Sequence, residues 1–403
     1  MYEVKAGDTF DSISRKVYGT NEKAAILKAA NPGVGNPPQA GAILFTPSTE
    51  PPRVPSSAKT DLVSITINGS TFQGWERAEI TRSMDTFGTF TFEAVWSPEI
   101  PEHRAAFRPF QYQDVALFDG LDLLFTGTLL DATPSIDATS SKITASGYST
   151  PGVLNDCTVP ASAMPLEGDT RTLREVAKPI LDLFGLRLVM PDAGAAFDRE
   201  AIAPEDKAFD YLAKLAKQRN VIITDTPDGA CRIYKEAEGP PVARLAPGGY
   251  QSISPQFSPQ EYYSDITGRA PTAVLGEDDD AGSVFTVVNP RLRGRARPFT
   301  FKVDDATEGT LPEATRAKLG RMHGSAVTYS MAVNSWRTPS GKLWAPGDTV
   351  EVLAPQAMIY KYYLFLVRDV KYSLDGSSKT AALTLVLPGA FSGKMPETMP
   401  WEE

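Results

Sequence analysis

Histidine and cysteine are scarce in this chain of 403 residues, which contains two of each. Cys157 and Cys231 are too few for a disulfide framework, and with His103 and His323 they do not form the spaced sets that bind zinc. We therefore expect free cysteines in a protein that folds in a cytoplasm. No nucleophile or carboxylate constellation can be tied to either histidine, so the sequence predicts no catalytic residue, no bound metal and no cofactor.

Long hydrophobic runs and nucleotide-binding loops are also missing. The most apolar stretch, Met358 to Val370, is interrupted by Lys361, Arg368 and Asp369, so no transmembrane helix is expected. The first ten residues, MYEVKAGDTF, lack the basic and apolar segments of a signal peptide. No glycine-rich phosphate loop, G-x-S-x-G turn or H-E-x-x-H pair is present, which argues against the common nucleotide-binding and hydrolase classes.

Proline and glycine, in contrast, are plentiful. The 33 prolines and 31 glycines indicate many turns and short elements, and so a mainly β protein. The net charge of −9 argues against sequence-independent binding to nucleic acid.

The hydrophobic period changes along the chain and divides it into parts. Residues 1–48 predict a βααβ unit, with Asp8 and Asn21 available to cap its two helices. Residues 49–60, TEPPRVPSSAKT, predict a semi-rigid proline-rich linker. Over most of the remainder, hydrophobic residues alternate as in β-strands, and Asn68-Gly69 predicts a hairpin turn. Helical patterns interrupt this alternation, one capped by Thr172 and another over Pro312 to His323.

The predicted fold class is therefore mainly β with an α+β insert. After the N-terminal βααβ unit, we expect two small β-barrel domains that flank and pack with an α+β domain. The predicted boundaries are 61–160 for the first β-barrel domain, 161–245 for the α+β middle domain, 246–390 for the second β-barrel domain and 391–403 for a C-terminal tail.

The first 48 residues resemble a LysM domain. The matching residues are Tyr2, Val4, Gly7-Asp8-Thr9-Phe10, Ile13, Tyr18-Gly19, Asn31-Pro32 and Gly41 through Pro47. The resemblance implies a groove that binds the N-acetylglucosamine backbone of peptidoglycan or chitin, or that docks another protein. Its implied residues here are Asp8, Thr9, Phe10, Asn31, Pro32 and Gly33. The alternative is that these residues only cap helices and fill a small core.

The rest of the chain, about 61–390, resembles the baseplate hub protein of contractile-tailed bacteriophages of the Mu type. The resemblance rests on the order of several short motifs over this length. These motifs are Ile67-Asn68-Gly69, Phe72-Gln73-Gly74-Trp75, Ile80-Thr81-Arg82-Ser83, Phe125-Thr126-Gly127, Gly147-Tyr148-Ser149, Leu154-Asn155-Asp156-Cys157, the run from Phe209 to Arg232, Trp336, the run from Gly341 to Gly347, Leu385-Val386-Leu387-Pro388 and Ala390-Phe391.

This resemblance implies a structural protein of the virion tail baseplate, assembled in the host cytoplasm. It implies a homotrimer whose two β-barrel domains per chain form a pseudo-sixfold ring between a hexameric tail tube and a trimeric central spike. A tube-initiator protein in place of the tail tube, and wedge or sheath-initiator proteins, are further implied partners. DNA passes through the lumen without specific binding. Two alternatives stay open: the equivalent hub of a phage-like contractile injection system, and, from a different class, a cell-wall-degrading enzyme targeted by LysM.

Four arginines alternate in a short segment, at positions Arg291, Arg293, Arg295 and Arg297. If the segment is extended, they lie on one face. They predict either a charged edge that blocks unwanted strand pairing or a salt-bridged subunit interface, for which the acidic loop 276–282 (GEDDDAG) is a candidate partner.

Overall fold

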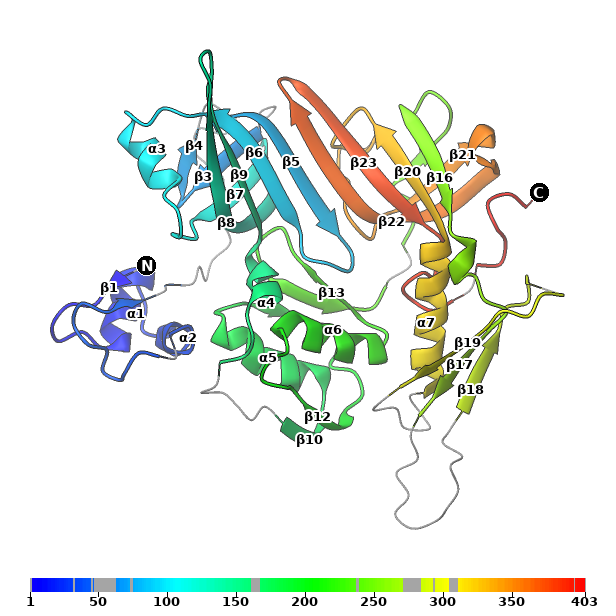
Figure 1. Cartoon of the computed structure of the whole chain (residues 1–403), viewed down its shortest axis with the longest axis horizontal. Helices are drawn as coiled ribbons and strands as arrows, with labels where there is room; N and C mark the ends of the chain where they lie inside the picture. The colour runs from blue at the N-terminus through cyan, green and yellow to red at the C-terminus, as the bar shows by residue number, and fades with distance from the viewer. Residues whose placement is uncertain are drawn as a thin grey trace, which may run out of the picture.

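The structure is a computed structural model of the whole chain. It describes residues 2–31, 33–44, 46, 63–72, 75–160, 167–236, 239–270, 284–292, 294–303, 311–394 and 396–402. A small N-terminal unit lies at one end, two β regions lie side by side, and helical units lie beneath them (Figure 1). The predicted linker 49–60 and the acidic loop 276–282 lie outside the described residues.

The N-terminal unit has its own small core. Its elements are β1 (Tyr2–Glu3), α1 (Phe10–Tyr18), α2 (Ala24–Ala29) and β2 (Ile43–Leu44), with β1 antiparallel to β2. Helix α1 begins after Thr9, whose hydroxyl oxygen accepts a hydrogen bond from the Ser12 amide at 3.1 Å, and it ends at Gly19 in the left-handed conformation. Phe10, Ile13 and Leu27 fill the interior.

The first β region is a meander of strands that mostly pair with their sequence neighbours. Phe90, Phe92 and Ala94 alternate with more exposed residues, which places them on the buried face. Its elements are β3 (Val63–Ile67), β4 (Ser70–Phe72), β5 (Trp75–Ser83), β6 (Thr89–Val95), α3 (Pro101–Ala106), β7 (Asp114–Asp119), β8 (Asp122–Ile136) and β9 (Ser141–Ser149). The strand order is β5-β6-β9-β8-β7-β3-β4.

The middle unit packs two helices on two small sheets. Thr172 caps helix α5, as the sequence predicts, and it forms a reciprocal capping box with Glu175. Leu173, Ile180 and Leu212 are among the residues of its core. Its elements are η1 (Thr150–Gly152), α4 (Val153–Asp156), β10 (Glu167–Arg171), α5 (Leu173–Leu183), β11 (Leu188–Val189), β12 (Phe197–Ala201), α6 (Ala208–Gln218), β13 (Ile222–Asp225) and β14 (Cys231–Tyr234).

The second β region assembles strands that are far apart in sequence. Strand β15 pairs in parallel with β21, so residues 243–245 belong to this region rather than to the middle unit in which the sequence places them. Its elements are β15 (Ala243–Leu245), β16 (Ser252–Phe257), β20 (Val327–Val333), β21 (Thr349–Ala354), η4 (Pro355–Ala357), β22 (Ile359–Asp375) and β23 (Ser378–Val386).

An excursion between β16 and β20 forms a further layer that the sequence reading did not separate. It contains η3 (Pro259–Glu261), β17 (Asp265–Arg269), β18 (Val284–Val288), β19 (Pro298–Lys302) and α7 (Leu311–Ala326). The three strands form their own sheet in the order β18-β17-β19. Leu319 and Met322 of α7 pack against Ile266 of β17, which closes a separate small core.

The two β regions are joined by direct strand pairing. Strand β22 pairs antiparallel with β5, with Tyr372 opposite Ile80. One 13-stranded sheet therefore runs through both regions, whereas the sequence predicts two separate β-barrel domains. Because this sheet is hydrogen-bonded across the boundary, the two regions form one continuous framework.

The C-terminal residues pack on the second β region rather than forming the tail predicted over 391–403. Phe391 and Met399 are buried, and the Tyr363 hydroxyl donates a hydrogen bond to the Thr398 carbonyl at 2.8 Å. The rings of Trp401 and Phe257 meet edge to face, with centroids 5.5 Å apart. This segment therefore covers one end of the second region's core.

Candidate functional site: the junction beneath the β5–β22 seam

Polar side chains fasten the seam between β5 and β22 on its surface. The Arg77 guanidinium lies 3.1 Å from the Asp375 carboxylate, and the Lys371 ammonium lies 3.0 Å from Glu79. At the end of the seam, the Ser83 hydroxyl donates to Asp369 at 2.5 Å. These exposed ion pairs favour one register of the two strands, and each contributes only about 0–1 kcal/mol to stability.

The middle unit is bonded to the turn that follows β5. The Thr224 hydroxyl donates to the Ser83 carbonyl at 2.6 Å, and the Gly88 amide donates to the Asp225 carboxylate at 2.6 Å. Burial raises the pKa of Asp225, although the Arg82 charge and the Gly88 amide both oppose that rise. Burial of the charged carboxylate therefore costs more free energy than the hydrogen bond and the Arg82 charge recover.

The second β region meets the middle unit at the same place. The Phe391 amide donates to the Glu236 carboxylate at 2.9 Å, and the Asn220 side chain donates to the Ser392 carbonyl at 3.0 Å. A small apolar cluster, which includes Ile222 and Phe391, lies among them. The first β region, the middle unit and the second β region thus meet beneath the seam.

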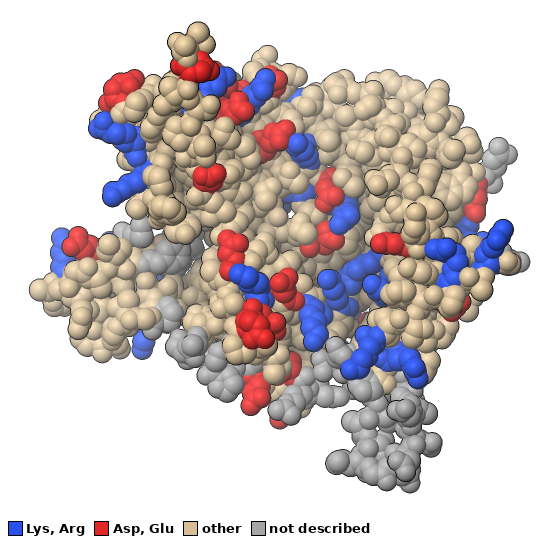
Figure 2. All heavy atoms as spheres, in the orientation of Figure 1, with Lys and Arg blue, Asp and Glu red and all other residues tan. Residues whose placement is uncertain are grey.

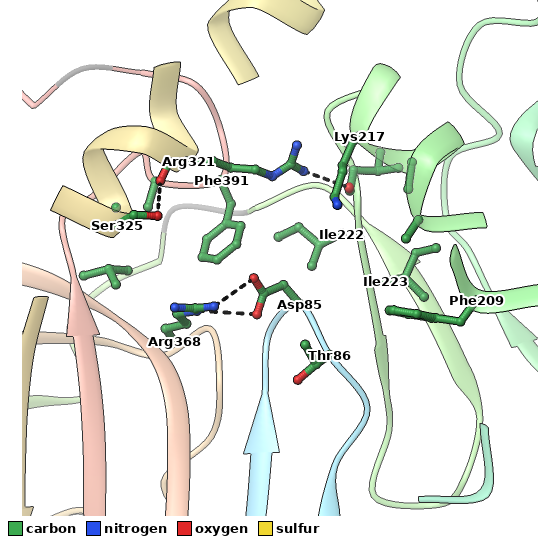
Figure 3. A pocket seen from close by; sticks show the side chains of 16 residues that line it. Asp85, Thr86, Phe209, Lys217, Ile222, Ile223, Arg321, Ser325, Arg368 and Phe391 are labelled. Carbon is green, nitrogen blue, oxygen red and sulfur yellow. Dashed lines mark hydrogen bonds and ion pairs between the residues drawn. The ribbon is translucent and has the colours of Figure 1, made fainter. Parts of the chain in front are cut away.

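A cavity of about 350 Å³ opens at this junction (Figure 3). Its walls come from the turn after β5, from α6 and β13, from α7, and from β22, β23 and the segment after β23. The residues that line it are Asp85, Thr86, Phe209, Ala213, Ala216, Lys217, Val221, Ile222, Ile223, Arg321, Gly324, Ser325, Arg368, Val386, Ala390 and Phe391. Basic side chains gather on this face around the approach of α6 to α7 (Figure 2).

Sequence reasoning missed this cavity because its residues are spread over the chain without a motif. One signal was present: Arg368 and Asp369 interrupt the most apolar stretch of the sequence, inside what is now strand β22. Charged residues that directly follow the buried run Phe365–Val367 indicate a polar partner. For Arg368 that partner is Asp85, at 3.3 Å.

The residues predicted to form a LysM groove make mostly internal contacts. Asp8 is buried, accepts hydrogen bonds from the Tyr2 hydroxyl and the Lys5 amide, each at 2.9 Å, and pairs with Lys16. The hydrogen bond from Lys16 is the main cause that lowers the pKa of Asp8 well below its usual range. These contacts account for Asp8 as a residue that holds the unit together.

The other groove positions divide between cap, core and surface. Thr9 caps α1, Phe10 is buried in the core, and the Asn31 side chain donates to the Leu27 carbonyl at 2.7 Å. Gly33 is exposed, and Pro32 lies outside the described residues. The glycan-binding or protein-docking role of this set stays a prediction.

Arg291, Arg295 and Arg297, the described members of the predicted arginine row, do not lie in a strand. Arg291 pairs with Glu402, and Arg297 donates to the carbonyls of Tyr262 and Gln260 at 3.0 and 2.8 Å. Arg295 is exposed, and Arg293 lies outside the described residues. Two of the four arginines are thus engaged within their own chain, where they hold the C-terminal segment and the η3 turn.

The scarce histidines and cysteines serve as packing residues. His323 is buried, which lowers its pKa to about 4, and its ring lies 5.2 Å from that of Tyr262. His103 packs against the rings of Phe72 and Trp96. Cys157 and Cys231 are both free, and burial raises the pKa of each thiol.

Two searches of the described residues gave negative results. No group of three or more histidine, cysteine or carboxylate side chains is arranged to hold a metal ion within those residues. Among the helices of the described residues, none has the length and apolar character needed to span a membrane.

Comparison with known families and structures gives a consistent result. Residues 151–235 match the second domain of the gp44-like baseplate hub protein, and residues 313–394 match the fourth domain of the Mu phage baseplate assembly protein GpP. The chain is 21% identical over 313 residues to the baseplate hub protein gp44 of Escherichia phage Mu, covering 74% of this chain and 81% of that protein.

Two solved structures share the fold. The 43 kDa tail protein of prophage MuSo2 from Shewanella oneidensis matches with a TM-score of 0.69 and 24% identity, covering 81% of this chain and 98% of that one. The tail protein from Neisseria meningitidis MC58 matches with a TM-score of 0.70 and 19% identity, covering 82% and 98%. The two domain matches and the phage Mu relative support a function as a baseplate hub of a contractile phage tail, and the two solved structures show that this chain shares its fold with tail proteins.

Proposed function

We propose that this chain acts as a homotrimeric adaptor that joins the hexameric tail tube to the trimeric central spike. The single observation that carries the proposal is the β5–β22 seam, which holds two β regions in one sheet. Three such chains would present six β regions around a ring. A threefold assembly could then match a sixfold tube on one side and a threefold spike on the other.

A cluster of exposed apolar side chains supports a subunit contact on the second β region. Phe257 and Trp401 are 41% and 37% exposed although their rings are in contact, and Tyr360 is 48% exposed. The Tyr360 amide donates to the Pro400 carbonyl at 3.3 Å, which places all three side chains in one area. Exposed aromatic residues are enriched in the centres of protein interfaces.

Trimer formation can be tested by light scattering on the purified chain. We expect a mass of three chains, and we expect Trp401→Glu to shift the protein toward monomer while Leu121→Glu, on the exposed β7–β8 turn, does not. A monomer at every concentration, with and without spike protein, would contradict the proposal.

The acidic chain suits a structural part around a DNA channel. A net charge of −9 disfavours retention of phosphate, so DNA can pass without being held. We propose a structural role rather than an enzymatic one, since the relatives found are hub and tail proteins. A zymogram on peptidoglycan tests the alternative of a cell-wall enzyme, because a clear band would contradict the structural role.

A phage-like contractile injection system is the closest alternative setting for the same hub. The sheet that joins the two β regions would serve equally well there. Genes for a capsid and a terminase beside this one would favour a phage, and their absence would favour the injection system.

The N-terminal unit is proposed to dock on a neighbouring baseplate protein. Its internal bonding leaves an independent core, so it can act as a separate module. Deletion of residues 1–48 should leave a folded trimer that attaches wedge or sheath-initiator proteins poorly. Normal assembly followed by failure to adsorb or penetrate the cell wall would favour binding to peptidoglycan instead.

Of the arginine segment, we propose that Arg295 alone contacts a neighbouring subunit. Arg295 is exposed, while Arg291 and Arg297 are already bonded within the chain. Arg295→Glu should therefore weaken assembly in a salt-dependent way without lowering the melting temperature of the monomer. A structure of the assembly with Arg295 facing the central channel would contradict this contact.

A further inference from the structure

The cavity beneath the seam carries an excess of positive charge. Its charged lining residues are Asp85, Lys217, Arg321 and Arg368. Both oxygens of Asp85 face Arg368, at 3.3 and 3.5 Å, so these two residues neutralise each other. The charges of Lys217 and Arg321 remain. Figure 3 shows these two side chains at one end of the cavity and the Asp85–Arg368 pair at the other.

Among the described residues, neither remaining cation lies within ion-pair distance of a carboxylate, although the Asp85 charge acts on Arg321 from farther away and favours its charged form. Arg321 donates one long hydrogen bond, 3.3 Å, to the Val221 carbonyl. A guanidinium has five N–H donors, so several of them are left for another acceptor. Burial also lowers the pKa of Arg321, which reflects the cost of a desolvated positive charge. In a chain with a net charge of −9, this local excess indicates a place for an anion.

The remaining walls of the cavity are apolar. Phe209, Ile222, Ile223, Val386 and Phe391 contribute side chains, and Phe391 lies between the two charged ends in Figure 3. The volume of about 350 Å³ falls at the lower end of the range for small-ligand sites, roughly 300–1,000 Å³. A fully hydrated inorganic anion would leave these walls without a partner.

We propose that this cavity binds a carboxylate carried on an apolar body. The carboxylate would accept hydrogen bonds from the fork of Arg321 and pair with Lys217, and the apolar body would contact Phe391 and Ile222. The same chemistry is offered by a free aromatic acid and by an acidic residue next to an aromatic one in a peptide segment. Because the walls come from the first β region, the middle unit, α7 and the second β region, a bound ligand would hold these parts together and raise the melting temperature.

Calorimetric titration of the full chain tests the charge requirement. The probes are phenylacetate, its neutral analogue phenylacetamide, and the peptide N-acetyl-Phe-Asp-amide. We expect phenylacetate or the peptide to bind, and phenylacetamide to bind at least about tenfold more weakly, because the amide lacks the charge that the two cations recognise. Tighter binding of the peptide than of phenylacetate would identify a protein segment as the ligand, and the reverse order would identify a free acid.

Variants test the residues. Arg321→Gln should weaken binding by about tenfold to a hundredfold, and Lys217→Gln by a smaller factor. Lys318→Gln is the matched control. Lys318 lies on α7, as Arg321 does, but its ammonium is over the Phe299 ring and does not line the cavity. Lys217 is exposed and has no bonded partner in the described part of the chain, so its variant tests the proposal even if Arg321→Gln does not fold.

The proposal is overturned if no probe binds, if phenylacetate and phenylacetamide bind equally, or if the Lys217 and Arg321 variants bind as the unmodified chain does. It does not rest on the adaptor role. Light scattering on the same samples reports trimer formation separately, so failure of one proposal can be told from failure of the other.

Discussion

The two β regions share one sheet but fill their cores with different kinds of side chain. The first region packs phenylalanines, including Phe90, Phe92 and Phe125, which have no polar atom to satisfy. The second region buries Trp336 and Tyr372, and the Trp336 indole N–H donates to the Ser373 and Thr380 carbonyls at 3.1 and 3.0 Å. The packing of phenylalanine depends on shape alone, whereas the packing of Trp336 also depends on the hydrogen bonds of its indole N–H.

The regions also differ in how their strands are assembled. In the first region, most strands pair with a sequence neighbour, as β5 does with β6 and β7 does with β8. In the second, β16 pairs with β20 across a long excursion, and β15 pairs in parallel with β21. Specific polar contacts in the core help to select such distant pairings, and this would explain why the second region contains them.

The largest expected effect comes from emptying either core. Trp336→Ala and Phe92→Ala should each lower the free energy of unfolding by about 3–5 kcal/mol. The conservative variants separate the two regions: Trp336→Phe should cost about 1–3 kcal/mol because it leaves two carbonyls without their donor, and Phe92→Leu about 1 kcal/mol. Calorimetric melting of the four variants measures this, and equal costs for the two conservative changes would contradict the comparison.

Breaking the seam should separate the two regions. Thr81 of β5 pairs with Lys371 of β22 on one side and with Thr89 of β6 on the other. Thr81→Pro therefore disrupts the ladder of a central strand, at a cost of about 3 kcal/mol or more. Thr81→Val is the control, because it keeps the strand. We expect calorimetry to resolve two melting transitions in the proline variant. One transition with unchanged width would show that the regions do not depend on the seam.

The buried titratable groups beneath the two regions should respond to pH in opposite directions. The pKa of Asp225 is raised in the fold, so the folded chain holds its proton longer and loses stability as pH rises through the acidic range. The pKa of His323 is lowered to about 4, so the unfolded chain binds a proton first and stability falls as pH drops below about 6.5.

Substitution of His323 or of Asp225 should remove the part of the pH dependence of stability that the substituted residue causes. His323→Gln should abolish a loss of about 2 kcal/mol between pH 6.5 and 5, and Asp225→Asn should flatten the decline that begins near pH 4. Urea unfolding over the pH range measures both, with His103→Gln as the histidine control. A steeper dependence in either variant would contradict the assignment.

The smallest expected effect concerns the surface of the seam. Arg77→Glu should lower stability by no more than about 1 kcal/mol, because its partner Asp375 is exposed. The double variant Arg77→Glu and Asp375→Arg should restore most of that loss. Both differences should shrink at high salt, and a loss that is independent of salt would show that Arg77 acts through packing instead.

The sequence predicted those parts of the fold that depend on neighbouring residues. The helix cap at Thr172 and the hairpin turn at Asn68-Gly69 lie where local patterns predict them. The helix expected over Pro312 to His323 is α7, extended at both ends. In each case the signal and the structure lie within a few residues, so local propensity suffices.

The seam and the cavity could not be predicted in the same way. Asp369 of β22 lies opposite Ser83 of β5 although the two are 286 positions apart. No local pattern in either strand predicts which other strand it pairs with. The prolines and polar residues around Met399 predict an unpacked C-terminal tail, yet the Met399 side chain is buried. Such contacts depend on the assembled surface, which a one-dimensional pattern does not describe.

Strand β22 has a mechanical consequence. Its 17 residues pair with β21 along the first part and with β5 along the last, so a single stretch of backbone belongs to both regions. A load applied to one region travels along this strand as tension and across its hydrogen bonds as shear, with no loop between them to absorb it. When a contractile tail drives its tip against a surface, such a chain would deflect as one stiff plate rather than fold at its middle.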